Sequence, residues 1–574
     1  MRYVCIHSHC YQPPREDPWT NEVDREISAW PFHDWNERIT AECYTPNTVA
    51  RVLDGDQRIA RSVNNYSQTS FDFGPTLLSW LERKVPETYG AICSADQESR
   101  RRFSGHGSAM AHAYNHVILP LANGRDKATQ VYWGIRDFVH RFGRQPEGMW
   151  LPETAVDLET MEILASFGIK FTLLSPRQAK AIRKNGGDGW QDVSDGRIDP
   201  SQAYWLSLPS GKSISLFFYD GPVSQAISFE GLLHNGEKFI ERLLTAYSSE
   251  RGRSELVHVV TDGEVYGHHH THGEMALAFA LEQLERRGLA RITNYGEFLE
   301  QHPPVCEVRI AENTSWSCAH GVDRWRRHCG CHVGRADWSQ EWRAHLRGSM
   351  DWLRDKLADR YQRKAAELVR DPWAARNDYV EVLLDGSDES WARFLNRHCW
   401  RPLRPAEHET LSQLLELQRH AMLMYTSCGW FFDDASGIET RLVIGHAARV
   451  VELAGILFQE NLEPGLLEKL DLVKSNIAER GNGASIYQNL RKPLSAAAND
   501  GAGREPEHWL NTLVSDWMDQ FQATGSMTFE TIERVLRLHK EAYRRDLETA
   551  RRMYRTYPQF FEDLEPPKTR AAGA

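Results

Sequence analysis

From residue 1 to about residue 300, short β-branched or aromatic runs alternate with amphipathic stretches, and this alternation limits the fold more than any other feature. It is typical of parallel strands covered by helices, because each helix returns the chain to the start of the next strand. The predicted strands are residues 3–7, 148–151, 171–174, 213–218 and 256–261. The predicted helices include residues 128–142, 158–167 and 275–287. We therefore expect an α/β fold, either a barrel or a doubly wound sheet.

After about residue 305 the strand-like runs thin out, and long helical periods cover residues 339–369, 408–425 and 440–459. A chain of 574 residues exceeds what one hydrophobic core usually organises. We expect a barrel over residues 1–304, a helical region next to its site over 305–400, and a helical C-terminal domain over 401–574. Within the last, residues 497–507 have the composition of a mobile connection, and residues 566–574 that of a disordered tail.

The amino-acid composition limits the classes of partner that the protein is expected to bind. The 68 basic and 79 acidic residues give a net charge of −11 without a basic block, which argues against nucleic acid and anionic membranes. Ten irregularly spaced cysteines, and an N-terminus without signal-peptide features, predict a cytoplasmic protein. No apolar run approaches the roughly 20 residues that span a bilayer.

Two carboxylate motifs follow apolar runs. Trp150-Leu151-Pro152-Glu153 has a proline where strand pairing would stop, and Asp262-Gly263-Glu264 follows the buried pattern of residues 257–261. In a parallel barrel the carboxyl ends of the strands face the active site. Paired acids at that end suit the cleavage of a sugar, one attacking and one delivering a proton. The alternatives are a helix cap or surface position for Glu153, and an Asx-turn for Asp262.

Donation of a proton by Asp262 requires a raised pKa, and a second carboxylate nearby is one established cause. Glu264 has three possible roles: it binds sugar hydroxyls, orients Asp262, or pairs with an arginine.

Histidines cluster near the N-terminus and again directly after the Asp262 motif. His268, its neighbours at 269, 270 and 272, and the pair His7 and His9 suit either a metal site or hydrogen bonds to sugar hydroxyls. We favour the sugar interpretation and expect no metal and no cofactor. The segment 105–121 adds His112, Asn115 and His116, which are either glycan contacts or parts of a structural surface loop.

Aromatic residues follow in the second half. Trp316, Asp323 and Trp325 suit a sugar-stacking rim, with core packing of the tryptophans as the alternative. Cysteines 318, 329 and 331 with nearby histidines are compatible with zinc, but the paired Cys-x2-Cys spacing of zinc ribbons is missing. Trp430, in a run of aromatic and acidic residues, lies either over the barrel mouth or in a helical core.

Taken together, these motifs resemble glycoside hydrolase family 57, whose members act on α-glucans. The resemblance covers roughly the first 330 residues and rests on three runs: His7 to Pro13, Trp150 to Glu153, and Asp262 to His268. The segments 105–121 and 316–325 are similar to further conserved regions of the family. The sequence departs from the family pattern in two places: the opening motif has His9 and Tyr11 around Cys10 rather than a bare His-Gln-Pro, and Tyr266 replaces the commoner Phe.

The resemblance implies an incomplete seven-stranded β/α barrel followed by helices, with the C-terminal half similar to an uncharacterised helical domain found in a subgroup. It implies Glu153 as the nucleophile and Asp262 as the general acid/base of a retaining enzyme, with carboxyl groups about 5 to 5.5 Å apart. Water as acceptor gives hydrolysis, and a sugar hydroxyl gives transfer or branching. We expect these residues to bind the oligo- or polysaccharide: His7, His9, Gln12, His112, Asn115, His116, Trp150, Glu264, Tyr266, His268, Trp316, Asp323, Trp325 and Trp430.

Two other functions fit the sequence. One is a metal-dependent carbohydrate hydrolase of the deacetylase or α-mannosidase type, because such enzymes also combine incomplete barrels with His/Asp clusters. The other is a glycan-binding protein without catalytic activity.

Overall fold

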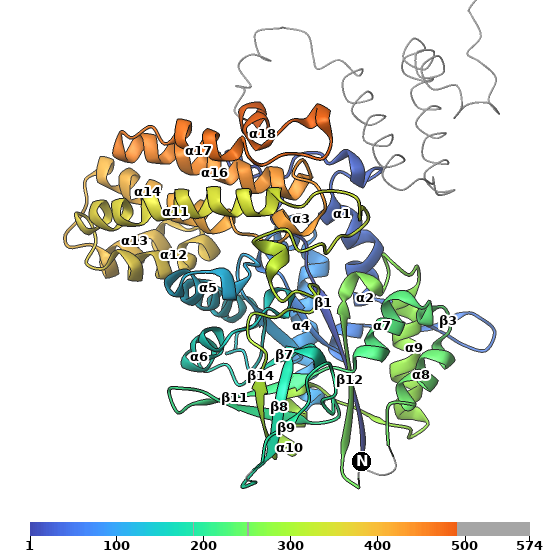
Figure 1. The fold of residues 1–574 in the computed structure, drawn as a ribbon. Helices are drawn as coiled ribbons and strands as arrows, with labels where there is room; N and C mark the ends of the chain where they lie inside the picture. Colours follow the sequence, from blue (N-terminus) through green and yellow to red (C-terminus); the bar gives the residue numbers. More distant parts are fainter. Residues whose placement is uncertain (188, 249–251, 491–574) are drawn as a thin grey trace, which may run out of the picture. The chain divides into compact units, whose positions relative to one another are not determined.

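The computed structural model describes residues 1–187, 189–248 and 252–490 (Figure 1). Within this part, residues 1–331 and 338–490 form one compact unit. Residues 332–337 are grouped apart from it and contain an ion pair between Arg335 and Asp337. The predicted connection at 497–507, the predicted tail at 566–574 and the end of the 401–574 domain lie outside the described residues.

The core of the first half is an incomplete barrel of parallel strands. Within the described residues seven strands follow one another in space as β12, β1, β4, β5, β6, β7 and β11, and a parallel bridge between Gly148 and Phe171 joins β6 to β7. Their bounds are β1 (Arg2–Cys10), β4 (Ser70–Phe73), β5 (Ala109–His112), β6 (Met149–Trp150), β7 (Phe171–Leu174), β11 (Ser213–Phe218) and β12 (Glu255–Asp262). The predicted barrel and its incompleteness are confirmed.

Shorter strands extend and flank this barrel. Beyond β11 the sheet continues through β10 (Ala203–Ser207), β14 (Cys306–Ile310), β8 (Ala179–Lys184) and β9 (Gln191–Asp192). In addition β13 (Arg291–Ile292) pairs with the start of β1, and β2 (Ala50–Leu53) forms a hairpin with β3 (Ile59–Val63). The sheet therefore continues beyond residue 304, the predicted end of the barrel region.

Helices cover the barrel between its strands. They are α1 (Trp35–Ile39), α2 (Thr45–Thr48), α3 (Pro75–Lys84), α4 (Pro86–Arg102), α5 (Gly124–Phe142), α6 (Leu158–Ser166), α7 (Gly221–Phe229), α8 (Gly236–Leu244), α9 (Gly273–Arg286) and α10 (Tyr295–Gln301). Local signals fix their ends: Asn123, Asp157 and Asp220 cap α5, α6 and α7 by accepting backbone N–H bonds. Figure 1 shows α7, α8 and α9 beside β12.

The second half is helical, as the sequence pattern predicts. It comprises α11 (Trp342–Ala366), α12 (Pro372–Asp385), α13 (Asp388–His398), α14 (Pro405–Leu423), α15 (Cys428–Phe431), α16 (Ile438–Phe458), α17 (Glu463–Leu470) and α18 (Gly483–Leu490). None of the described helices is both long and apolar enough to cross a membrane.

This helical region packs against α5 of the barrel. Trp133 on α5 is fully buried in an apolar cluster with Tyr361 and Leu411, and its Nε1 donates to the carbonyl oxygen of Asn377 at 2.8 Å. Because the two halves share one apolar cluster, the helical region is part of the structure that holds the barrel.

Candidate active site

Strand register brings the predicted acids and histidines to one end of the barrel. In β1, His9 lies opposite Asp262 of β12 on one side and Asp72 of β4 on the other. Farther along the same edge, His112 at the end of β5 lies opposite Trp150 at the end of β6. These positions are all at the carboxyl ends of parallel strands, where barrel enzymes place their chemistry.

Glu153 lies in a 3-10 turn, Pro152–Thr154, directly after β6. The turn places Glu153 at φ 57° and Thr154 at φ 50°, a left-handed conformation that residues with a side chain rarely adopt. The Glu153 carboxylate accepts two hydrogen bonds on Oε2, from Trp316 Nε1 at 2.9 Å and from Ser317 Oγ at 2.5 Å. Among the described residues, no donor reaches Oε1, so one carboxylate oxygen is held and the other is free to react.

The donors to Glu153 come from a segment that pairs with the Glu153 turn. Val156 and Thr314 form an antiparallel bridge, and the Trp316 backbone N–H donates to the carbonyl oxygen of Glu153 at 3.0 Å. Backbone pairing over residues 153–156 and 313–316 therefore fixes where Trp316 and Ser317 meet the carboxylate.

Asp262 ends β12 at a close approach to β1. A Cβ on the next residue, Gly263, would lie 2.4 Å from Cys10 Sγ, so only glycine fits there. The Asp262 side chain is exposed to water on one side. Protein nevertheless surrounds it densely enough that desolvation, followed by the charges of Glu264 and Glu153, raises its pKa to about 7. Asp262 therefore exchanges a proton near neutral pH.

Glu264, two residues after Asp262, is buried. Its Oε1 accepts hydrogen bonds from the Tyr44 hydroxyl, from the Tyr11 backbone N–H at 3.4 Å and from Gln12 Nε2 at 3.5 Å. Burial raises the pKa of Glu264. None of these three contacts is to an arginine or to Asp262, but the charge of Glu264 raises the pKa of Asp262.

Asp72 is the centre of a buried histidine network. Its carboxylate receives His7 Nε2 at 3.0 Å, His9 Nδ1 at 2.9 Å and His112 Nδ1 at 2.7 Å. Burial opposes ionisation of Asp72, but the charge of His9 and the three imidazole hydrogen bonds hold its pKa well below the usual range.

Protonation differs among the three histidines of this network. Burial disfavours the charged form of His9, yet Asp72, Asp262 and Glu264 outweigh it and raise the pKa of His9 to about 9. Burial lowers the pKa of His7 and of His112, which are therefore neutral at pH 7. The site thus contains one buried cation between Asp72 and Asp262.

The helical region contributes a residue to this site. His116 Nδ1 pairs with the Ser427 hydroxyl at 2.6 Å, and the Ser427 backbone N–H donates to the carbonyl oxygen of His116 at 3.0 Å. Tyr11 stacks on the other side of His116 with ring centroids 3.7 Å apart. Residues between α14 and α15 therefore complete the wall formed by His116.

Of the remaining predicted residues near the site, Trp150 and Trp316 lie beside the histidines. The Trp150 ring is buried and stacks on His9 at 4.5 Å, and Trp316 meets it edge-on at 5.1 Å. Gln12 accepts from Arg15 Nη2 at 3.2 Å, in addition to its contact with Glu264.

Three further predicted residues have structural partners. Asn115 accepts from Gln130 Nε2 at 2.8 Å, Tyr266 is buried in an apolar cluster, and His268 pairs with Glu42 at 2.5 Å. These contacts give each of them a role in holding the loops around the site.

Three residues that were predicted to bind the substrate are not brought to the site: Asp323 and Trp325 of the expected rim, and Trp430. Trp325 and Trp430 are buried in the core of the helical region, where Trp430 Nε1 donates to the Arg343 carbonyl oxygen at 3.1 Å. Asp323 is paired with Arg326 and Arg327, each at 2.7 Å. Core packing therefore takes the place of sugar contacts at Trp325 and Trp430, and local ion pairs do so at Asp323.

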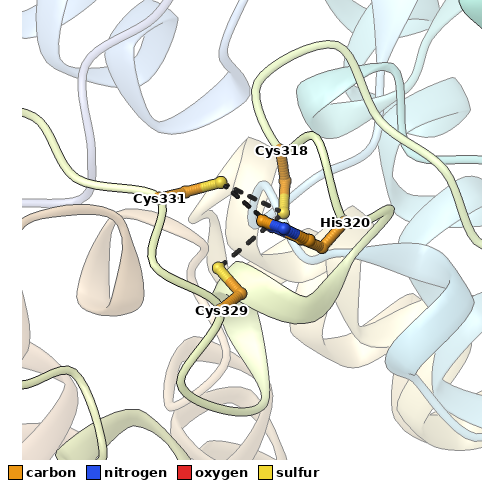
Figure 2. Close-up of side chains that lie close together, drawn as sticks. All are labelled: Cys318, His320, Cys329 and Cys331. Atoms are coloured by element: carbon orange, nitrogen blue, oxygen red, sulfur yellow. Dashed lines mark hydrogen bonds between the residues drawn. The ribbon is translucent and has the colours of Figure 1, made fainter.

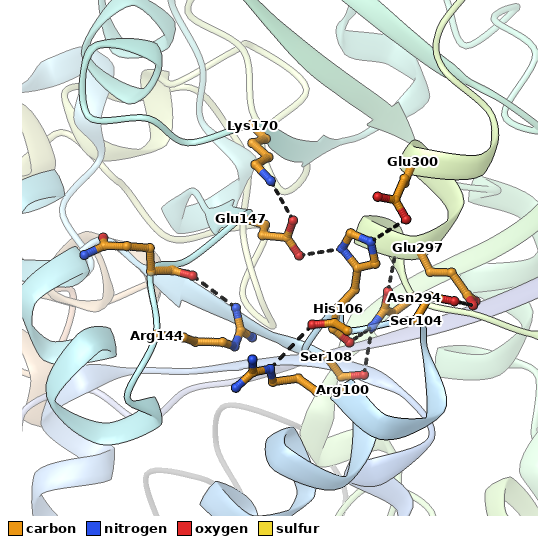
Figure 3. A network of polar contacts seen from close by, with 12 residues as sticks. Arg100, Ser104, His106, Ser108, Arg144, Glu147, Lys170, Asn294, Glu297 and Glu300 are labelled. Carbon is orange, nitrogen blue, oxygen red and sulfur yellow. Dashed lines mark hydrogen bonds and ion pairs between the residues drawn. The ribbon is translucent and has the colours of Figure 1, made fainter.

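The segment 105–121 is also divided between the two ends of the barrel. His112 and His116 reach the site, whereas His106 lies before β5 and joins a polar network at the amino ends of the strands (Figure 3). His106 Nδ1 pairs with Glu147 at 2.9 Å and its Nε2 with Glu300 at 3.1 Å, and Lys170 pairs with Glu147 at 2.8 Å. At His106 the segment therefore has a structural role.

Three contributors were not identified as site residues from the sequence: Asp72, Ser317 and Ser427. Asp72 has a weak signal, because an acid between Phe71 and Phe73 interrupts an apolar strand. Ser427 has none, since only tertiary packing brings it to His116.

The chain is similar to several known proteins. Residues 10–311, more than half of the chain, match the profile of glycosyl hydrolase family 57, and residues 338–500 match a domain of unknown function (DUF3536). α-Amylase 1 of Dictyoglomus thermophilum is 23% identical over 195 residues, which cover 34% of this chain and 25% of that protein. The chain thus spans about a quarter of the length of this curated relative.

Among solved structures, an exo-type maltose-forming amylase from Pyrococcus sp. ST04 is similar with a TM-score of 0.60 and 17% identity, over 82% of both chains. This likeness establishes the fold. A family 57 branching enzyme from Pyrococcus horikoshii has a TM-score of 0.49 and 15% identity, over 85% of this chain and 94% of that chain.

Proposed function

Because the chain belongs to glycosyl hydrolase family 57, we propose that it cleaves or transfers α-glucans such as glycogen, starch or maltooligosaccharides with retention of configuration. The observation that carries the proposal is the pair of carboxyl groups at the same end of the barrel, one after β6 and one at the end of β12. One of them, Glu153, is held by two donors on a single oxygen, and the other, Asp262, has a pKa of about 7. Unequal carboxyl groups at one site are the arrangement that a double displacement needs.

In the first step Glu153 Oε1 attacks the anomeric carbon while Asp262 gives its proton to the departing glycosidic oxygen. In the second step the ionised Asp262 takes a proton from the acceptor, whose oxygen displaces Glu153 from the anomeric carbon. Water as acceptor gives hydrolysis, and a sugar hydroxyl gives transfer.

Polar atoms around the acids are suited to sugar hydroxyls. Among the described residues, His112 Nε2 and His116 Nε2 are buried without a hydrogen-bond partner. Buried imidazole nitrogens of this kind are costly unless a ligand satisfies them, which supports hydroxyl recognition on the His112 and His116 side.

A metal-dependent hydrolase remains the second candidate because His9, Asp72 and His112 are close enough to share a cation. Both imidazoles, however, already use Nδ1 to bond Asp72 Oδ2. Such an enzyme would lose a bound metal on the substitution Asp72→Asn.

The proposal is tested by incubating the protein with maltooligosaccharides, amylose and glycogen and determining the linkage and anomeric form of the first products. We expect α-anomeric products, and turnover at least a thousandfold lower in Glu153→Gln with the fold unchanged. Full activity of Glu153→Gln, or β-anomeric first products, would contradict the proposal.

A further inference from the structure

A loop beyond the barrel gathers three cysteines and a histidine that the proposed reaction does not use. Cys318, His320, Cys329 and Cys331 each turn a ligand atom toward a common centre (Figure 2), and these atoms lie within 4.8 Å of one another. Cys331 Sγ is 3.8 Å from Cys318 Sγ and 3.5 Å from His320 Nδ1, and Cys318 Sγ is 4.0 Å from Cys329 Sγ. All three thiols are free of disulfides.

These separations match the edges of a tetrahedral zinc site. With Zn–S bonds of about 2.3 Å and a Zn–N bond of about 2.0 Å, neighbouring sulfurs lie about 3.8 Å apart and sulfur and nitrogen about 3.6 Å apart. A disulfide, in contrast, would need the two sulfurs at about 2.0 Å. The observed spacings therefore fit three thiolates and one imidazole around a shared ion.

The backbone of the loop is shaped to present these atoms. Gly330, between Cys329 and Cys331, adopts φ 83°, which lets both neighbouring thiols face the same point without steric cost. The carbonyl oxygen of Cys331 accepts from Gln340 Nε2 at 2.7 Å and from the buried Arg343 Nη1 at 3.1 Å. The loop is thus fixed to α11 at its far end.

We propose that Cys318, His320, Cys329 and Cys331 bind one structural Zn²⁺ through three Sγ atoms and Nδ1. The three thiols release their protons to solvent on binding, and the neutral imidazole supplies the fourth ligand. Thiolates select zinc over hard cations such as Mg²⁺ and Ca²⁺. The short spacings Cys-x-His and Cys-x-Cys explain why a search for Cys-x2-Cys pairs does not reveal the site.

The proposed ion lies next in sequence to the residues that hold Glu153. Cys318 directly follows Trp316 and Ser317, the two residues that bond Glu153 Oε2. An ion that joins Cys318 to Cys331 restricts the conformations of the loop between them and of the adjoining residues 316 and 317. The zinc site therefore acts as a positioning element for Glu153, although its existence does not depend on the reaction.

Metal analysis of the purified full-length protein tests the proposal without any activity assay. We expect one zinc per chain, and at least a tenfold lower zinc content in Cys331→Ser and in Cys329→Ser. Cys93→Ser is the matched control, because Cys93 is a free, half-buried cysteine on α4 outside the cluster. It should keep the full zinc content.

A second measurement on the unaltered sequence covers the case in which the serine variants do not fold. Replacing the bound ion by Co²⁺ should give the intense visible absorption of a tetrahedral thiolate site, and His320→Ala should change that spectrum. Less than a tenth of a zinc per chain after exposure to zinc salt would overturn the proposal. So would a disulfide among the three cysteines under reducing preparation, or zinc that stays in Cys331→Ser and leaves in Asp72→Asn.

Discussion

At the scale of single residues, the site depends on an unusual backbone at Glu153. Two consecutive residues with side chains, Glu153 and Thr154, take up the left-handed region, at an expected cost of about 1–3 kcal/mol each. Gln178 compensates by donating to the Thr154 carbonyl oxygen at 2.8 Å and accepting from the Thr154 hydroxyl at 2.9 Å. The fold thus holds Glu153 Oε1 in one orientation at a cost in stability.

The hydroxyl of Ser317 should matter for rate more than for stability. In Ser317→Ala the carboxylate of Glu153 keeps only the Trp316 donor, so we expect kcat to fall about tenfold with KM nearly unchanged. Steady-state kinetics on the α-glucan that the wild type turns over measures this. Ser315→Ala is the control, because Ser315 bonds Gly321 in the same loop and does not contact Glu153. An equal loss in both variants would contradict a specific role of Ser317.

The pH dependence should follow Asp262. Its pKa is raised to about 7, so the protonated acid is lost as the pH rises through this value, and kcat/KM should fall on the alkaline side. Glu264→Gln removes one of the charges that raise this pKa. We therefore expect the alkaline limb of the kcat/KM profile to move down by about one pH unit. An unchanged or upward-shifted limb would show that Glu264 does not act through its charge.

At the scale of elements, β4 provides the base of the histidine network, and its Asp72 should control stability. Asp72→Asn leaves the buried His9 cation without its partner, which should lower the free energy of unfolding by about 3 kcal/mol at pH 6. Denaturant unfolding with matched circular dichroism spectra measures this. Asp192→Asn, at an exposed residue of β9, serves as the control and should change stability by less than about 0.5 kcal/mol.

The sign of the pH effect on stability also follows from this network. The folded pKa of His9 is raised to about 9, so its contribution is complete below about pH 6.5 and is lost between there and pH 9. The pKa of Asp72 is depressed, so its contribution is present above about pH 4 and is lost only as the pH falls further. A wild-type stability that rises from pH 6.5 to 9 would be incompatible with this assignment.

The strands that end at the two acids could be predicted, whereas β4 and β5, which carry Asp72 and His112, could not. Strands β7 and β11 and the longer strands β1 and β12 have clear apolar runs, which places Asp262 at a strand end from sequence alone. Strands β4 and β5 are as long as β7, but they contain buried polar side chains, so periodicity does not reveal them. The sequence pattern therefore does not identify Asp72 as a residue near the end of a strand.

Aromatic residues show a second limit of sequence reasoning. Trp316 and Trp325 are nine residues apart in one motif, yet the first bonds Glu153 and the second is buried in the helical core. The local sequence does not determine whether a tryptophan contacts a sugar or packs in an apolar core. The tertiary packing of the helices around Trp325, Trp342 and Trp430 determines it.

At the scale of the whole molecule, the barrel and the helical region belong to one compact unit even though they match two different family profiles. Val117 and Ile118, which follow β5, belong to the apolar cluster of the helical region, and the bridge between Val117 and Thr426 joins the two backbones. The boundaries predicted at residues 304 and 400 stay predictions. The contacts indicate that the two parts unfold together.

Trp133 offers a test of this coupling. Trp133→Ala removes a fully buried side chain from the shared cluster and should lower the free energy of unfolding by about 3–5 kcal/mol. Scanning calorimetry should show a single transition that moves to lower temperature as a whole. Phe229→Ala is the control, because Phe229 is 82% exposed and its loss should have little effect. Two transitions, of which only one moves, would indicate independent domains.

Trapping the covalent intermediate would show directly whether Glu153 is the nucleophile. In a 5-fluoro-α-glucosyl fluoride the ring fluorine slows both displacements, but the good fluoride leaving group keeps the first one fast, so the glycosyl-enzyme should accumulate and inactivate the protein. Peptide mass spectrometry should then find one added fluoroglucosyl group on the peptide that contains Glu153, and none in Glu153→Gln. A label on Asp262 or on another residue, or steady turnover of the natural substrate without any label, would contradict the account.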